Sequence, residues 1–277
     1  MIAVAVRPTR AGSAAIGIGR SASRALLREL VAWPKPGLVS LVDNGSHDDM
    51  RPGHFVRSAR VLRHYFTECA RAGGRGAGFG ELRRLGVAAE VAMTRATGGV
   101  NAHRGAIFAL GLLAGAAGAR PKTTLGAHVR VRWGEDLLAH RRDPASHGSH
   151  AARRLGIGGA QAEAAAGFPS VYAVALPAWR RVREAGGDAN AAAVHALFAL
   201  VAVIDDTNLV HRGGEIGLRF AQHAAREFLD GGGMLAPDGM ARALQVHRAF
   251  VARRLSPGGS ADLLAAALLV QNLEGAR

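Results

Sequence analysis

The sequence contains little cysteine and few aromatic residues. Cys69 is the only cysteine, which excludes an intrachain disulfide and a zinc site built on several cysteines. A chain without disulfides is typical of a reducing compartment, so we expect a cytoplasmic protein. Aromatic residues are 5% of the chain, and no basic segment alternates with them as in platforms that stack nucleic-acid bases.

Long hydrophobic runs are also missing. The longest, from Gly105 to Ala119, lies between two arginines and is shorter than the roughly 18–20 residues that a membrane-spanning helix needs. The first residues lack the charged and then apolar layout of a signal peptide. We therefore expect no membrane association.

Acidic residues are outnumbered by basic ones, and the net charge is +14. A polyanionic partner such as nucleic acid is one explanation. The other is a GC-rich genome, because only Lys35 and Lys122 are lysines while arginine, alanine and glycine abound. Since no run of five or more like charges is present, we favour the second explanation and expect no nucleic-acid partner.

Apolar residues recur at helical spacing, and no convincing strand pattern is present. Residues 105–118 and 191–204 are apolar on all sides, which indicates central helices of a bundle. Further helices are expected at residues 55–69, 82–97, 171–182, 216–229, 240–255 and 261–273. The sequence predicts an all-α protein, a single compact multi-helix bundle with functional loops at helix ends. Residues 1–20 are expected to be a loose N-terminal tail and residues 21–277 a single all-helical catalytic domain.

The segment PKPGLVSLVDNGSHDDM, residues 34–50, gathers ionisable groups in a predicted loop. Two prolines stiffen the backbone on either side of Lys35. His47, Asp48 and Asp49 precede a helix, whose dipole favours acids at its start. A capped turn and a ligand-binding loop are both consistent with this pattern.

The segment TGGVNAHRGAIF, residues 97–108, begins a buried helix with Asn101 as a predicted N-cap. His103 and Arg104 then fall in the first turn, where cations oppose the helix dipole. A bound phosphate would reverse that sign, because N–H groups and cations would all face an anion. The alternative is an ordinary helix start with an exposed arginine.

Two adjacent acids, Asp205 and Asp206, end the apolar helix that begins near residue 191. Anions have the wrong sign at a helix C-terminus, which suggests a compensating cation. Mg²⁺ fits, since it binds one or two carboxylates together with substrate phosphates. A polar, self-capped loop is the alternative. Glu163, between glycine-rich and apolar stretches, is a further candidate carboxylate.

Five stretches, in order, resemble the triphosphoribosyl-dephospho-CoA synthase family. They are PKPGLVSLVDNGSHDDM, LRRLGVAAEVAMTRATGGVNAHRGAIFALGLL, GFPSVYAVALP, DDTNLVHRGG and SPGGSADLLAAALL. The resemblance covers nearly the whole chain, from about Ala25 to Leu273. This sequence departs from the family at Ala102, where a threonine is usual, so any role for that hydroxyl is in doubt.

The resemblance implies a transferase. ATP donates its 5-triphosphoribosyl group to the 2′-hydroxyl of 3′-dephospho-CoA, and adenine leaves. The product is the precursor of the prosthetic group of an acyl-carrier subunit, to which a second transferase passes it. Malonate decarboxylase and citrate lyase use this group, and the DDTNLVHRGG form with the arginine-rich composition favours malonate decarboxylase.

Roles for the motif residues follow from this reaction as hypotheses. An oxocarbenium-like transition state needs carboxylates, and the reaction needs an acid and a base. The predicted catalytic residues are His47, Asp48, Glu163 and Asp206. The predicted substrate-binding residues are Lys35, Asn44, Asn101, His103, Arg104, Asn208, His211 and Arg212. The predicted Mg²⁺ ligands are Asp49, Asp205 and Asp206.

Two other functions stay open from the residues alone. One is an all-helical, Mg²⁺-dependent ADP-ribosyl or nucleotide hydrolase that uses water as the acceptor. The other is a basic nucleic-acid-binding protein, although such a protein would carry a basic stripe along an exposed helix. A homodimer is also a candidate assembly.

Overall fold

The computed structural model describes residues 10–140 and 159–275. These ranges contain eleven α-helices and no strand, so the predicted all-α class is confirmed. In chain order the helices are α1 (Arg10–Val31), α2 (Pro52–Gly74), α3 (Phe79–Thr97), α4 (Arg104–Ala119), α5 (Leu125–Ala139), α7 (Gly159–Ala165), α8 (Leu176–Glu184), α9 (Ala189–Val203), α10 (Thr207–Asp230), α11 (Gly239–Ala252) and α12 (Gly258–Glu274). A π-helical segment, Val171–Ala175, leads into α8, and a short 3-10 helix, Gly233–Leu235, follows α10.

Helix α1 corrects the expected loose tail. The helix begins at Arg10, so residues 10–20 are helical, while residues 1–9 lie outside the described residues. Helix α1 packs along α2, and at Gly19 an added Cβ would lie 2.1 Å from Thr67 Oγ1. Small residues here therefore mark a helix crossing rather than a flexible segment.

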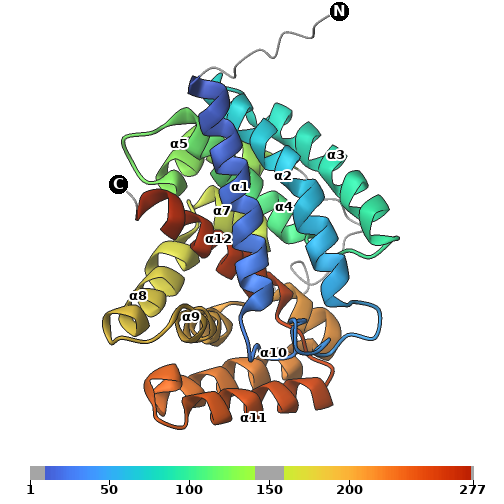
Figure 1. Cartoon of the computed structure of the whole chain (residues 1–277), viewed down its shortest axis with the longest axis vertical. Helices are drawn as coiled ribbons and strands as arrows, with labels where there is room; N and C mark the ends of the chain where they lie inside the picture. Colours follow the sequence, from blue (N-terminus) through green and yellow to red (C-terminus); the bar gives the residue numbers. More distant parts are fainter. Residues whose placement is uncertain (1–9, 141–158, 276–277) are drawn as a thin grey trace, which may run out of the picture.

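The buried helices predicted from composition are confirmed. In α4 and α9 most residues are buried, and both helices contact α12. Figure 1 shows α1 crossing the front of the molecule, with α2 and α3 beside it and α12 running behind. One continuous hydrophobic cluster includes side chains from α1 through α12. Burial of apolar area on this scale is the main force that holds such a bundle together.

Helices α10 and α11 lie together at the end of the molecule where α1 terminates (Figure 1). The loop from Ala32 to Arg51 connects α1 to α2 and reaches α11 and the residues after it. His247 Nδ1 lies 2.6 Å from the Lys35 carbonyl, and Ser46 Oγ donates to the Leu255 carbonyl at 2.6 Å. This packing brings the first sequence motif against the last one, more than 200 residues away.

Among the described helices, none alone is long and apolar enough to cross a membrane. The bent pair formed by Ala189–Val203 and Thr207–Leu235, at 59°, passes the same test by length and composition only.

Candidate active site

A cavity of about 390 Å³ lies where α4, α7, α9, α10 and α12 meet. Its wall contains four carboxyl groups, those of Glu163, Asp205, Asp206 and Asp262. Sequence analysis selected the first three and missed the fourth. We call this cavity the acidic pocket, and its size is in the range typical of small-molecule sites, about 300–1,000 Å³.

The Asp206 carboxylate joins two helix starts. Its Oδ1 accepts the Asn208 N–H at 2.9 Å as the N-cap of α10. Its Oδ2 accepts the N–H and the hydroxyl of Ser260, in the first turn of α12, at 2.7 and 3.0 Å. The sequence analysis placed Asp206 at the C-terminus of the preceding helix, where an acid is unfavourable. That prediction was wrong for Asp206, because this residue begins α10 and its negative charge is favoured there.

The predicted set of Mg²⁺ ligands does not assemble. Among residues 10–140 and 159–275, no three histidine, cysteine or acidic side chains gather closely enough to hold a metal ion. Asp49 lies near His47, away from the acidic pocket. Asp205 is different, because it is exposed at the pocket and its Oδ1 accepts only a 3.2 Å bond from Gln222 in the described structure.

Glu163 is held by the turn that follows α7. Its two carboxylate oxygens accept the N–H of Ser170 at 2.8 Å and the Ser170 hydroxyl at 3.0 Å. The turn passes through Phe168, a buried residue with φ of 61°, which is a strained conformation for a bulky side chain and costs about 1–3 kcal/mol. Burial raises the pKa of Glu163, and the two Ser170 bonds oppose that rise.

Asp262 belongs to α12, and its carboxyl group lies at the start of α4. The N–H of Ala106 donates to its carboxylate, and an added Cβ at Gly105 would lie 2.0 Å from its Oδ2. Burial, with the nearby charges of Glu29 and Asp206, raises the pKa of Asp262 well above its usual value. The carboxyl group of Asp262 from α12 therefore occupies the start of α4, where a bound phosphate was expected.

The two basic residues at the start of α4, His103 and Arg104, have partners within the protein. His103 is buried, its Nδ1 lies 2.7 Å from Ser58 Oγ, and its Nε2 has no hydrogen-bond partner among the described residues. Burial and the positive charge of Lys35 lower the pKa of His103 to about 3, so the ring is neutral at pH 7. Arg104 Nε pairs with Glu90 at 3.0 Å, and Asn101 Oδ1 accepts the Arg104 N–H at 3.2 Å.

Lys35 is buried rather than directed at a ligand. Its side chain is 1% exposed, pairs with the Glu29 carboxylate and donates to the Glu29 carbonyl at 2.7 Å. Burial lowers the pKa of Lys35, and the pair with Glu29 opposes that effect. Because a phosphate cannot reach this ammonium without breaking the pair, we no longer assign Lys35 to phosphate binding.

His47 and Arg212 form a second group of predicted residues. Arg212 Nη2 lies 2.9 Å from His47 Nδ1, and His47 Nε2 lies 2.9 Å from Ser256 Oγ. A guanidinium only donates, so Nδ1 accepts and Nε2 carries the proton of the neutral ring. Burial and Arg212 lower the pKa of His47, which supports that neutral form. Both ring nitrogens are thus engaged, so we do not assign His47 as the base.

The other predicted residues surround this group. Asp48 pairs with Arg254 at the surface, and Asp49 Oδ1 lies 3.6 Å from His47 Nδ1. The Asn44 carbonyl accepts the His47 N–H at 3.2 Å within the turn. Asn208 and His211 lie on the first turns of α10 and are exposed.

One segment joins the two groups. Residues 255–262, LSPGGSAD, run from the His47 group to the acidic pocket. Ser256 contacts His47, Ser260 binds Asp206, and Asp262 reaches the start of α4. Sequence analysis matched this segment to a family motif but drew no site residue from it. Asp262 was detectable as the one charged residue among the apolar residues 261–270.

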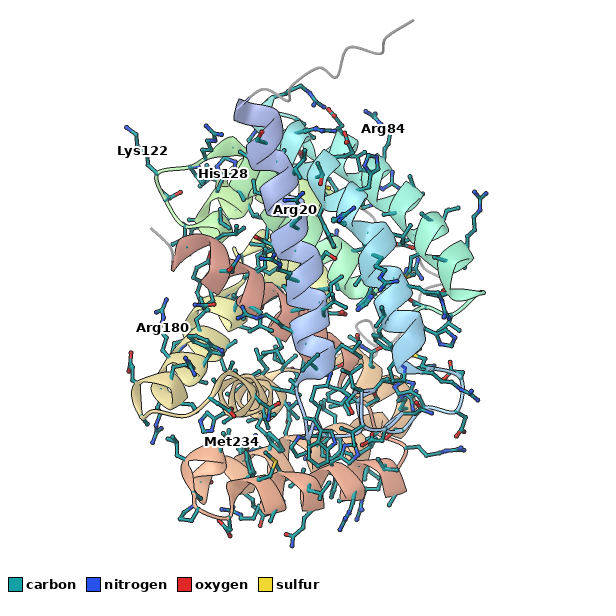
Figure 2. The ribbon with its side chains drawn as sticks, in the orientation of Figure 1. Arg20, Arg84, Lys122, His128, Arg180 and Met234 are labelled. Carbon is teal, nitrogen blue, oxygen red and sulfur yellow. The ribbon has the colours of Figure 1, made fainter. Side chains whose placement is uncertain are left out.

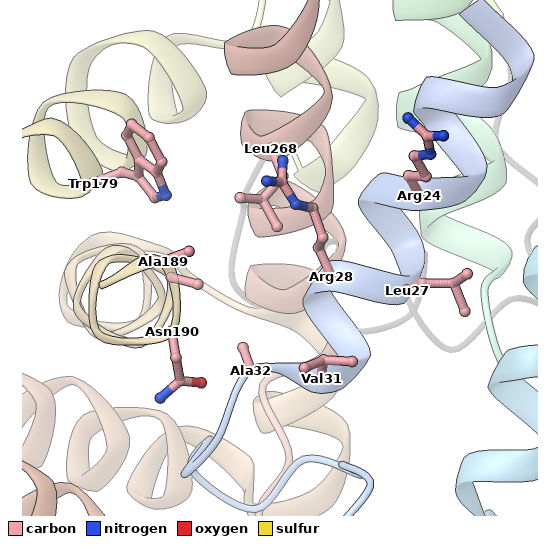
Figure 3. Close-up of a pocket in the computed structure, with 10 residues that line it drawn as sticks. Arg24, Leu27, Arg28, Val31, Ala32, Trp179, Ala189, Asn190 and Leu268 are labelled. Atoms are coloured by element: carbon pink, nitrogen blue, oxygen red, sulfur yellow. The ribbon is translucent and has the colours of Figure 1, made fainter. Parts of the chain in front are cut away.

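A second cavity, of about 380 Å³, has a different lining. Figure 3 shows Arg24 and Arg28 of α1 on one side of it and Trp179 of α8 on the other. We call it the arginine pocket, and it contains none of the predicted site residues. Its Asn190 is already used, because both ends of the side-chain amide bond the Trp33 backbone, at 2.8 and 2.7 Å.

The labelled basic residues in Figure 2 come from separate parts of the fold. Arg20 is on α1, Arg84 on α3, Lys122 between α4 and α5, and Arg180 on α8. Helix α1 also carries Arg24 and Arg28, which are exposed and follow Arg20 at steps of four residues.

Comparison with known proteins identifies the family. Residues 16–277 match the family described as CitG: ATP:dephospho-CoA triphosphoribosyl transferase. A "Probable 2-(5''-triphosphoribosyl)-3'-dephosphocoenzyme-A synthase" of Pseudomonas paraeruginosa (strain DSM 24068 / PA7) is 43% identical over 91% of this chain and 89% of its own. A "2-(5''-triphosphoribosyl)-3'-dephosphocoenzyme-A synthase" of Klebsiella pneumoniae is 40% identical over 87% and 86%. No solved structure matches the chain. The chain therefore belongs to the family of ATP:dephospho-CoA triphosphoribosyl transferases.

Proposed function

We propose that the acidic pocket is where this transferase moves the 5-triphosphoribosyl group of ATP onto the 2′-hydroxyl of 3′-dephospho-CoA. One observation carries the proposal: Glu163, Asp205, Asp206 and Asp262 line one cavity, although they come from three distant parts of the chain. In the reaction, C1′ of the ATP ribose loses its bond to adenine and gains a bond to the acceptor oxygen. Positive charge develops at C1′ in the transition state, and nearby carboxylates stabilise it.

Glu163 is our candidate for the base. The proton of the 2′-hydroxyl has to leave as that oxygen bonds to C1′. The Ser170 N–H and hydroxyl orient the Glu163 carboxylate and favour its ionised form, while partial burial keeps its pKa above the usual value. A carboxylate with these two features can accept a proton near neutral pH.

Asp205 is the candidate for holding Mg²⁺ in this proposal. Its exposed carboxylate fits a hard cation that takes one or two protein carboxylates and completes its shell with phosphate and water. Bound there, the ion would neutralise triphosphate charge. Asp206 is then a positioning residue, because its oxygens already accept three donors.

We assign triphosphate binding to the His47 group, with Arg212 as its main cation. Arg212 and Arg254 lie beside the segment that leads into the acidic pocket, and the Arg212 guanidinium contacts His47, Ser46 and Arg254. Asn208 and His211 are on the adjacent turns of α10, at the same end of the site. A planar, always charged guanidinium suits phosphate oxygens.

The pathway, the compartment and the assembly state of the enzyme are also proposals. We infer that the product serves a malonate decarboxylase rather than a citrate lyase, from the DDTNLVHRGG form and the arginine-rich composition. We also propose a cytoplasmic enzyme, active as a monomer or homodimer, that passes its product to the transferase forming the holo-acyl-carrier protein. Offering the purified product to that second transferase with each type of carrier subunit would separate the two pathways.

The direct test uses ATP, Mg²⁺ and dephospho-CoA. We expect free adenine and a coupled product, in equal amounts, measured by chromatography and mass spectrometry. Adenine or ADP-ribose without coupled product would indicate a hydrolase instead. No adenine release by folded protein would refute the transferase assignment.

A further inference from the structure

We propose that Asp262 is the acid that protonates adenine as its bond to the ribose breaks. This inference rests on the proposed function of the acidic pocket. None of the sequence motifs suggested the residue as a catalytic one. Its assignment depends on three features of the structure: its place in the pocket, its contact with α4 and the charges around it.

Asp262 borders the cavity and is held rigidly. It lines the acidic pocket together with Glu163 and Gly105. The Ala106 N–H binds its carboxylate, and the absence of a side chain at Gly105 lets Oδ2 approach the helix. A group held by a backbone contact keeps its orientation while a substrate binds, which is what proton transfer requires.

Burial and the charges around Asp262 favour a protonated carboxyl. Glu29 of α1 and Asp206 of the α9–α10 junction are the acids that face it, and both are almost fully buried. The Ala106 N–H favours the ionised form, and Lys35 is paired with Glu29. The net effect raises the pKa of Asp262, opposite to what a helix N-terminus alone would do.

The surroundings of Glu163 and Asp262 differ although the two residues line the same cavity. Ser170 donates to both oxygens of Glu163 and stabilises its anion, whereas like charges surround Asp262. Such a pair can serve as base and acid in one reaction. Asp262 gives its proton to a ring nitrogen of adenine. The electron pair of the C1′–N9 bond goes to N9 of the adenine ring, and neutral adenine leaves. Glu163 takes the 2′-hydroxyl proton, and solvent restores both groups.

The test compares Asp262→Asn with the wild type across pH. We expect the variant to lose about 100-fold or more in turnover with ATP. We also expect it to lack the alkaline fall in kcat/KM that deprotonation of the acid causes in the wild type. Asp136→Asn, the same change at an exposed position of α5, is the matched control and should behave as wild type. The same alkaline fall in Asp262→Asn would overturn the proposal.

A substrate with a better leaving group isolates the role further. Ribose 5-triphosphate carrying p-nitrophenol at C1 releases a phenolate that needs no proton. Asp262→Asn should lose less than about fivefold with this compound, and Asp262→Glu should recover part of the ATP activity. Equal losses with both substrates would refute an acid role.

If Asp262→Asn does not fold, the wild-type enzyme alone can test the acid role. Its kcat/KM should fall at alkaline pH with ATP but stay level with the p-nitrophenyl compound. Parallel profiles for the two substrates would exclude a donor of this kind. Failure of the proposed function is distinguishable, because the wild type would then release no adenine in the presence of dephospho-CoA.

Discussion

The acidic pocket and the arginine pocket have nearly the same volume, about 390 and 380 Å³, but opposite chemistry. The acidic pocket lies at helix ends, where segments from distant parts of the chain meet. The arginine pocket lies among α1, α8, α9 and α12, as Figure 3 shows, and its only charged lining residues are Arg24 and Arg28. Volume alone therefore does not select the site, and converging polar groups do.

Helix α9 separates the two cavities. Ala189 and Ala193, near its start, line the arginine pocket, and Val203, at its end, lines the acidic one. At 1.5 Å per residue, the ten residues from Ala193 to Val203 span about 15 Å. The variants below affect one pocket at a time and so test whether only one is catalytic.

Replacement of Glu163 by glutamine should produce the largest effect in this group. Turnover should fall by about 100- to 10,000-fold because the base is lost, while glutamine preserves the size of the side chain. Adenine release measures the effect, and thermal unfolding checks the fold. Glu135→Gln, at an exposed position of α5, is the control. Near-normal turnover in Glu163→Gln would remove this residue from the mechanism.

Asp206→Asn should mainly destabilise the protein. The amide cannot accept from Asn208 and from both groups of Ser260, so buried donors lose partners at a cost of about 2 kcal/mol. Urea unfolding measures the loss. The neighbouring Asp205→Asn should leave stability unchanged and instead raise the Mg²⁺ concentration needed for half-maximal activity. The reverse pattern would exchange the roles of the two aspartates.

His103 should make stability depend on pH. Its pKa is about 3 in the folded protein and near 6.5 when unfolded, so the unfolded chain binds the proton first. Below pH 6.5 each unit of acidification should then cost about 1.4 kcal/mol of unfolding free energy, until the pH approaches 3. His103→Gln should lose this component, and His64→Gln, an exposed control, should keep it. An unchanged pH slope in His103→Gln would contradict the buried neutral ring.

The smallest effect is expected in the arginine pocket. Arg28→Ala should change kcat and both KM values by less than about twofold, because no predicted site residue lies there. Steady-state kinetics with ATP and dephospho-CoA measure this. A tenfold rise in KM for dephospho-CoA would instead extend the substrate site to α1.

Several elements could be predicted from residue patterns, for reasons visible in the structure. The helices α4 and α9 are buried on all sides, so their composition alone distinguishes them. Helix α1 was missed because its first half is rich in glycine and serine, which helix propensity penalises, although Gly19 allows the close contact with α2. Helices α5 and α7 were missed as well, and only α7, with 7 residues, is short.

The chemical groups of the site were visible in the sequence, but their partners were not. The clusters at Lys35, His103 and Asp205–Asp206 were all unusual for their positions, and Lys35, His103 and Asp206 each make a buried polar contact. Residue order could not reveal that Lys35 pairs with Glu29 or that Asp206 caps two helices. Ser260 lies 54 residues from Asp206, and Glu29 faces Lys35 only because the loop after α1 folds back on that helix, so both contacts depend on packing.

The sequence by itself determined the helical class, the family and the set of ionisable groups available for chemistry. These properties depend on composition, periodicity and motif order, which are local or additive along the chain. Only the tertiary structure decided which charges are buried, which are paired, and that the carboxyl group of Asp262 on α12 lies at the start of α4. Burial and like-charge proximity arise when α1, α4 and α12 pack together, and these two effects set the protonation on which the proposed chemistry depends.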